Sequence, residues 1–293
     1  MHGATDSDRN TISWLAHVRR QMDAGGRSTF SVLPVEPWAQ NLDDSNFIGQ
    51  LRHKFGPPHP LDAYLPEPCN CAKHPPCKGT WHLMSCAKEG GPTRAHDRTV
   101  RELCKCCREV EVATSLETRH LLPFSRKRPA DALCILPDSD YRGTATDVTI
   151  TNCSLQTAAR GNLHAAKVIG FDATAREQDK RHKKVKTATG DNVSVPFALK
   201  QRNYNFLPFG IEVSGSLGRS ANHLLQKLSG LASGSAMNSK HLSFKFYWKL
   251  RIGFIVRQMA MESYILRARA LASPDVASSL PVQLDDLLPR ACC

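Results

Sequence analysis

Residues 128–150 read RPADALCILPDSDYRGTATDVTI, and this stretch decides the fold that the sequence predicts. The apolar run at 131–136 is typical of a buried strand, because it is short and bounded by turn residues. Residues 137–143 are rich in Pro, Asp, Ser and Gly, which favour a turn. The run at 146–151 alternates between polar and apolar residues, as a second strand does. We therefore expect a β-hairpin.

The two aspartates of this hairpin are the first candidate site. Val148 and Ile150 share one face of the second strand, whereas Asp147 and Thr149 share the other. Folding the hairpin about its turn brings Asp131, which begins the first strand, and Asp147 to the same open end. Two carboxylates beside a basic surface suit a hard divalent cation such as Mg²⁺.

The composition favours a globular protein with a polyanionic partner. The 293 residues allow one large domain or two modest ones, and a hydrophobic content of 41% is enough for a core. The net charge of +12 favours nucleic acid first and an acidic membrane surface second, with a solvated basic surface as the alternative. We expect no secretory signal, and the apolar stretch at 244–266 carries four Lys or Arg residues, too many for a membrane span.

We expect an α+β fold in four segments. Residues 1–40 form a lead-in, 41–110 a helical segment with a cysteine cluster, and 111–235 a small sheet flanked by helices. Residues 236–293 form a C-terminal helical tail. Aromatic and basic residues interleave at 244–251, a pattern that can stack on bases and neutralise phosphate, but a helix that packs on the core is favoured.

A cluster of cysteine and histidine residues predicts a zinc site. The chain has 11 cysteines and no export signal, which favours thiols and metal ligands over disulfides. Two close pairs, ten residues apart, supply a Cys3His set that can converge tetrahedrally: Cys69, Cys71, His82 and Cys86. Cys77 is a competing ligand and His74 a weaker one. Scattered free cysteines are the alternative.

A second cysteine group has a simpler interpretation. We expect a helix that begins near Arg94 and carries partly buried thiols rather than a metal site, namely Cys104, Cys106 and Cys107.

The basic sequence KRHKKVK, which starts at Lys180, predicts a helical region in which Glu177, Lys180 and Lys184 share one face. In a functional interpretation one lysine faces the carboxylate pair and the others meet phosphates. A solvated charged helix is the alternative. Residues 205–213 predict a further strand, in which Glu212 is either an additional site carboxylate or an acid that faces solvent.

Taken in order, these motifs resemble the restriction-like endonuclease region at the C-terminal end of site-specific non-LTR retrotransposon reverse transcriptase polyproteins. In that family a Cys/Cys/His/Cys cluster precedes an Arg-His-Asn-like motif, an Arg/Lys-Pro-Asp motif and a second acidic residue. The corresponding residues after the Cys3His set are Arg94-Ala-His96-Asp97, Arg128-Pro-Ala-Asp131 and Asp147. The order matches over roughly residues 40–235. Here Ala130 is inserted before Asp131, and the first cysteine pair has one intervening residue where two are expected.

The resemblance implies a PD-(D/E)xK-like nuclease, a Mg²⁺-dependent hydrolase that nicks DNA from a small mixed sheet with its carboxylates at one sheet end. Asp131 and Asp147 would hold Mg²⁺, with Glu117 or Glu212 as additional ligands. Thr149 stands where the superfamily usually has a lysine, so the following helix would supply it. The lysine candidates are Lys180 first, then Lys183 and Lys184.

The resemblance also implies nucleic-acid-binding residues, a structural Zn²⁺ in the Cys3His set and residence in the nucleus. The partner would be DNA, with RNA as an alternative, and no oligomeric state is predicted. The second hypothesis is an inactive nucleic-acid-binding zinc module, or a degenerate retroelement fragment, with vestigial acids. The expected nucleic-acid contacts are Arg94, His96, Arg128, Arg181 and Lys186.

Overall fold

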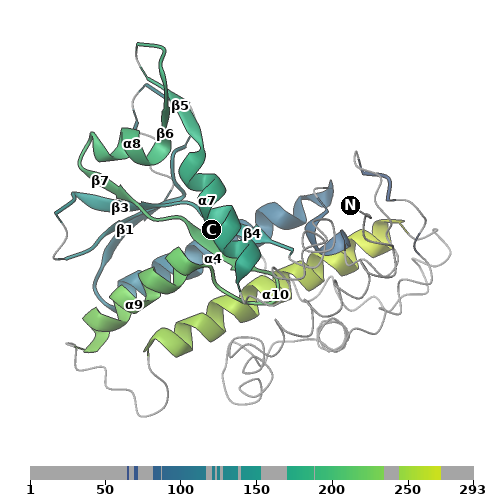
Figure 1. Cartoon of the computed structure of the whole chain (residues 1–293). Coiled ribbons are helices and arrows are strands. Elements are labelled where there is room, and N and C mark those ends of the chain that lie inside the picture. Colours follow the sequence, from purple (N-terminus) through teal and green to yellow (C-terminus); the bar gives the residue numbers. More distant parts are fainter. Residues whose placement is uncertain are drawn as a thin grey trace, which may run out of the picture.

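The computed structural model describes residues 65, 69–71, 82–86, 88–116, 121, 122, 124, 125, 128–137, 140–152, 170–187, 189–233 and 244–271. These residues form a small set of mixed strands surrounded by helices, so the predicted α+β class is confirmed (Figure 1). The lead-in at 1–40, His74, Cys77 and Glu117 lie outside the described residues.

The main sheet has four strands in the order β1-β2-β3-β7. Its first three strands pair antiparallel, and β7 then joins β3 in parallel. The strands are β1 (Ala113–Leu116), β2 (Ala132–Ile135), β3 (Gly143–Thr146) and β7 (Tyr204–Phe206). A hairpin is therefore present as β2 and β3, but its second strand lies before the predicted one at 146–151 and overlaps it only at Thr146.

Strands β4 (Val148–Thr151) and β8 (Phe209–Glu212) continue this arrangement beyond a break. They also pair in parallel, at the same residue offset as β3 and β7. The break falls at Asp147 in one strand and at Pro208, which has no N–H to donate, in the other. Across it, the Phe209 N–H donates to the Asp147 carbonyl oxygen at 2.9 Å, so the parallel pairing continues through the break.

The break changes two sequence-based expectations. The second hairpin strand begins at Gly143, and Asp147 follows its end instead of lying within a single strand over 146–151. The strand predicted at 205–213 is two strands, β7 and β8. Periodicity within one segment does not reveal the break, because the break also involves the parallel partner strand.

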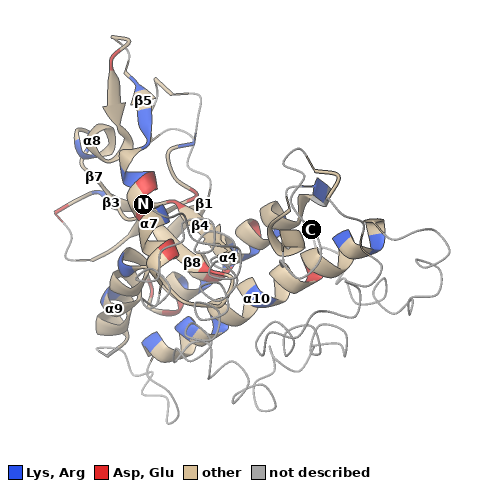
Figure 2. Ribbon diagram, turned by 45° about the vertical axis from the view of Figure 1, so that its right-hand side comes forward, with Lys and Arg blue, Asp and Glu red and all other residues tan. Residues whose placement is uncertain are grey.

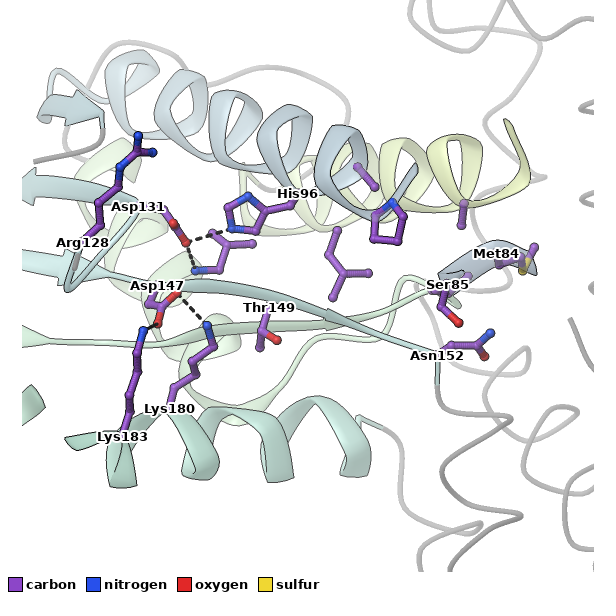
Figure 3. Close-up of a pocket in the computed structure, with 16 residues that line it drawn as sticks. Met84, Ser85, His96, Arg128, Asp131, Asp147, Thr149, Asn152, Lys180 and Lys183 are labelled. Atoms are coloured by element: carbon purple, nitrogen blue, oxygen red, sulfur yellow. Dashed lines mark hydrogen bonds and ion pairs between the residues drawn. The ribbon is translucent and has the colours of Figure 1, made fainter. Parts of the chain in front are cut away.

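Helices lie on both sides of these strands. Helix α4 (Gly91–Glu109) packs on β1, β2 and β4, and α7 (Phe171–His182) packs on β4 and β8. Figure 3 shows the strand with Asp147 running between the helix that carries His96 and the helix that carries Lys180. Helix α9 (Arg219–Ser233) contacts β8, and the long α10 (Phe244–Leu271) lies along α4.

Helix α7 is shorter than the basic sequence suggests. It ends at His182, and β5 (Lys184–Lys186) pairs antiparallel with β6 (Asn192–Ser194) before α8 (Val195–Lys200). The prediction that Lys184 shares a helical face with Glu177 and Lys180 is therefore wrong. The helix stops because Val185 turns into the core beside Val193 and Val195, and the Val195 N–H donates to the Lys183 carbonyl oxygen at 2.8 Å.

The largest apolar cluster lies between the strands and helices α4, α9 and α10. The Trp248 side chain is only 2% exposed within it, so the interleaved aromatic pattern of the tail belongs to a core helix, as favoured from the sequence. The second cysteine group is also buried there, and burial raises the pKa of the Cys104 thiol to about 11. No described helix has the length and apolar character needed to cross a membrane.

Candidate functional site

The carboxylates of Asp131 and Asp147 line one pocket of about 400 Å³ between α4 and α7 (Figure 3). The hairpin register explains their proximity, because Ala132 pairs with Thr146 and the aspartates occupy the next position on each strand. The Asp131 N–H donates to the Thr146 carbonyl oxygen at 2.9 Å, one residue out of this register, and ties Asp131 to the end of β3. In turn the Asp131 Oδ2 atom accepts a hydrogen bond from the Val148 N–H at 2.7 Å.

Two lysines from the end of α7 reach Asp147. The Lys180 Nζ atom lies 2.9 Å from Asp147 Oδ1, and the Lys183 Nζ atom lies 3.9 Å from Oδ2. The Asp147 side chain is 7% exposed, and this burial raises the pKa of its carboxyl. The positive charge of Lys180 acts in the opposite direction, and the negative charge of Asp131 reinforces the rise. The pocket therefore concentrates opposite charges around a poorly hydrated carboxylate.

His96 of α4 holds the other carboxylate. Its Nε2 atom lies 3.0 Å from Asp131 Oδ2, and its Nδ1 atom lies 3.1 Å from Asp97 Oδ1. The hydrogen bond with Asp131 raises the pKa of His96 to about 9, although burial alone would lower it. Burial alone would also raise the pKa of Asp131, but the hydrogen bond and charge of His96 outweigh it, so that pKa lies below its usual value. At neutral pH an imidazolium thus faces a carboxylate.

The remaining candidates divide into those near the pocket and those elsewhere. Arg128 is exposed and lines the pocket, as does Thr149 on β4. Arg94 is exposed on the first turn of α4, and it is not among the residues that line this pocket. The Arg181 Nη2 atom donates to Ser220 Oγ at 3.1 Å, toward α9. Lys184 and Lys186 are exposed on β5, beyond the pocket.

The structure does not support Glu212 as an additional ligand of a cation held by Asp131 and Asp147. It pairs with Thr151, four residues beyond Asp147, which is about 13 Å along the strand. Its side chain is fully buried and accepts hydrogen bonds from the Asp172 N–H at 3.2 Å and from Ser214 Oγ at 3.2 Å. Because β8 runs parallel to β4, the end of β8 lies away from Asp147, so both acids cannot bind one cation.

The sequence also missed groups that hold the pocket together. The Val148 N–H and the Asp97 carboxylate both contact its titratable side chains. Asp97 follows His96 directly, so the sequence could have identified it as an orienting partner. The Val148 N–H has no such signal, since its position depends on where β3 ends and β4 begins.

The Cys3His set forms a second constellation. The ligand atoms of its four buried residues lie within 4.8 Å of one another: Cys69, Cys71, His82 and Cys86. Cys71 Sγ lies 3.5 Å from His82 Nε2, and Cys69 Sγ lies 4.0 Å from Cys86 Sγ. The predicted cluster is thus present as a group that could hold a metal ion.

The donor set fits zinc. A tetrahedral zinc with Zn–S bonds of about 2.3 Å separates its sulfurs by roughly 3.8 Å, close to the spacing between Cys69 and Cys86. Burial raises the pKa of the Cys86 thiol, so an apolar surrounding alone disfavours the thiolate that a metal needs. The buried Arg267 on α10 places its Nη2 atom 3.9 Å from Cys69 Sγ and supplies positive charge there.

Comparisons of the chain with protein-family models, with curated proteins and with solved structures give no match. The plain conclusion is a mixed α+β protein with a Cys3His cluster and a separate pocket in which two carboxylates meet cationic side chains.

Proposed function

We propose that this chain is a metal-dependent endonuclease that hydrolyses a phosphodiester bond of DNA in the carboxylate pocket. The observation that carries the proposal is the convergence of Asp131, Asp147 and Lys180 in one pocket, since three different elements deliver them. The retrotransposon endonuclease resemblance points to the same two acids, and Lys180 is the first lysine candidate on the helix that follows them. The resemblance implies a small mixed sheet flanked by helices, with the carboxylates at one end of the sheet. The mixed sheet of this chain, with Asp131 and Asp147 beside each other, is compatible with that fold.

The exposed basic residues support a polyanionic substrate. Figure 2 shows Lys and Arg on β5 and α9, where Lys184, Lys186, Arg219 and Lys227 are exposed. Arg128, exposed at the pocket, is placed to contact a phosphate next to the carboxylates. Phosphate neutralisation by such residues predicts binding that weakens steeply as salt rises.

Asp131 and Asp147 offer the oxygen ligands that Mg²⁺ prefers, and would hold it between them. When bound, Mg²⁺ supplies a water of lowered pKa and offsets charge on the phosphate. Lys180 contributes positive charge where negative charge develops in the transition state. Lys183 lies further from Asp147 and gives a smaller effect. His96 orients Asp131 and keeps it ionised.

The Cys3His set would hold a structural Zn²⁺, because four protein ligands leave no open coordination position. It thereby fixes the segment between His82 and Cys86 against α10. Descent from a retroelement and residence in the nucleus belong to the same proposal and rest on the resemblance alone.

A plasmid-nicking assay tests the proposal. Supercoiled plasmid with Mg²⁺ should be nicked by the wild type, and Asp147→Ala should slow nicking by about 100-fold or more. Binding in EDTA should persist in both proteins. Asp179→Ala is the matched control, since Asp179 is an exposed acid on α7 that pairs with Arg176 at 3.1 Å. Nicking by Asp147→Ala at the wild-type rate would show that the carboxylate pocket is not the catalytic site.

A second candidate is a nucleic-acid-binding module without catalysis. The specific observation in its favour is that Lys180, Lys183 and His96 already pair with the two carboxylates, which a vestigial site could retain as a charge cluster. Salt-sensitive DNA binding without cleavage in Mg²⁺ or Mn²⁺ would favour this candidate.

A further inference from the structure

The pocket that contains the carboxylates has two chemically different halves. The charged half holds Asp131, Asp147 and Lys180. Figure 3 shows Met84, Ser85 and Asn152 at the opposite end of the pocket, with Thr149 between them and the charged group. The described residues that line this neutral half carry no charge.

The neutral half combines apolar walls with uncharged hydrogen-bonding groups. Met84, Val213 and Ala260 supply apolar surface, whereas Ser85 and Asn152 supply a hydroxyl and a carboxamide. Such surroundings suit a nucleobase, which has apolar faces and a polar edge. A surface that follows the backbone of a duplex would instead present Lys and Arg along its length.

The size and depth of the pocket also favour a single nucleotide. Its volume of about 400 Å³ falls within the range of roughly 300–1,000 Å³ typical of small-molecule pockets. The Asp147 side chain is 7% exposed and the Asp131 side chain 21%, so both acids are recessed. A phosphate on the outside of a base-paired helix does not reach recessed groups easily, whereas a nucleotide that has left the base stack can enter.

We propose that the neutral half binds the base of an unpaired nucleotide beside the scissile phosphate, so that the site acts where a DNA strand is unpaired. The inference rests on the proposed nuclease function and specifies its substrate. Part of the wall, Met84 and Ser85, comes from η2 (His82–Ser85), the segment that lies between two members of the Cys3His set. The metal cluster thereby shapes the base-binding half of the pocket.

The test compares two duplexes of identical sequence, one fully paired and one with a single-nucleotide bulge. Binding is measured in Ca²⁺ by fluorescence anisotropy, and cleavage is mapped in Mg²⁺. We expect the bulged duplex to bind at least 10-fold more tightly and to be cut next to the bulge. Equal affinity for the two duplexes would overturn the inference, even if both were cut.

Two variants assign this preference to the neutral half. Ser85→Tyr fills it from an exposed position and should remove the preference for the bulge. Asn152→Ala should reduce the preference by several-fold, and Asn192→Ala, at an exposed position on β6, is the control that should retain it. Metal content and circular dichroism confirm folding of each variant. A preference unchanged in both pocket variants would place base recognition elsewhere.

The two proposals fail separately. In one outcome no divalent metal supports cleavage, but the preference for the bulge persists in Ca²⁺ and Ser85→Tyr abolishes it. The nuclease proposal is then wrong, and the proposed nucleotide-binding pocket stands. If both duplexes are nicked and bound alike, the nuclease stands and the nucleotide pocket is wrong.

Discussion

Replacement of Glu102 by glutamine should destabilise the fold by weakening the contact between α4 and α10. The Glu102 side chain is fully buried, and its oxygens lie 2.8 Å from Lys105 Nζ and 2.8 Å from Arg251 Nε. Arg251 also donates to the Tyr247 hydroxyl at 3.0 Å and lies 5.1 Å from the Trp248 ring centroid. The amide would leave this cation beside the core without an anion.

The magnitude follows from the two hydrogen bonds. A hydrogen bond to a charged group contributes about 1.5–3 kcal/mol, and loss of one partner of a fully buried pair costs about 3–5 kcal/mol. The Lys105 side chain is 48% exposed, so water screens its share, and the Arg251 side chain is 21% exposed. We therefore expect Glu102→Gln to lower the free energy of unfolding by about 2–3 kcal/mol at pH 7.

The pH dependence gives a second readout. Burial alone would raise the pKa of Glu102, but hydrogen bonds from Lys105 and Arg251 outweigh it and hold the pKa below its ordinary value. A carboxyl with a lowered pKa contributes stability above its unfolded-state pKa and loses that contribution as the pH falls through the folded-state pKa. The difference between wild type and Glu102→Gln should therefore shrink in acid.

Urea unfolding followed by circular dichroism at pH 7 and pH 3 measures both effects. Asp179→Asn makes the same chemical change in the surface pair with Arg176, whose side chains are 62% and 41% exposed, and should cost at most about 0.5 kcal/mol. A loss below about 0.5 kcal/mol for Glu102→Gln at pH 7, or a loss that does not fall at pH 3, would refute this account of the α4–α10 contact.

Three further predictions concern the two constellations. Lys180→Met should slow nicking by about 100-fold or more while DNA binding in EDTA persists, and a wild-type rate would exclude Lys180 from the reaction. Metal analysis should find one zinc per chain in the wild type and none in the double variant Cys71→Ala/His82→Ala, and a metal-free wild type would contradict the zinc assignment. In NMR titrations in EDTA, His96 should lose its proton near pH 9, and Asp131→Ala should return the midpoint toward the usual value of about 6.5, because the hydrogen bond that His96 donates to Asp131 is the main cause of the rise. A wild-type midpoint near 6.5 would show that this hydrogen bond is absent.

The sequence was most informative where the determining signal is local. Turn residues between two apolar runs predicted a hairpin, and β2 and β3 form one, but the predicted second strand at 146–151 was misplaced. Asp147 lies near Asp131 because the second hairpin strand ends at Thr146. The spacing of the Cys3His set likewise predicted a cluster that the structure contains. Thr149 stands where a lysine is usual in the superfamily, so the lysine was sought on the next helix. Lys180 of that helix does reach Asp147.

The sequence was less informative where distant segments compete. The strand break at Asp147 lies opposite Pro208, about 60 residues away in the chain, so no pattern near Asp147 marks it. Glu212 has the sequence context of a site acid, and only the parallel direction of β8 shows that it lies too far along the strand. The end of α7 depends on the burial of Val185 beside a later segment. Lysine content there favours helix and carries no information about this packing.

The shared residue offset of the two parallel strand pairs constrains how this chain can vary. One residue added or removed between Gly143 and Asp147 would turn the following side chains to the opposite face and carry Asp147 away from α7. A change of length within the partner segment at 204–212 would likewise shift the pairing of that segment. Length variation among descendants of this sequence should therefore gather outside both segments.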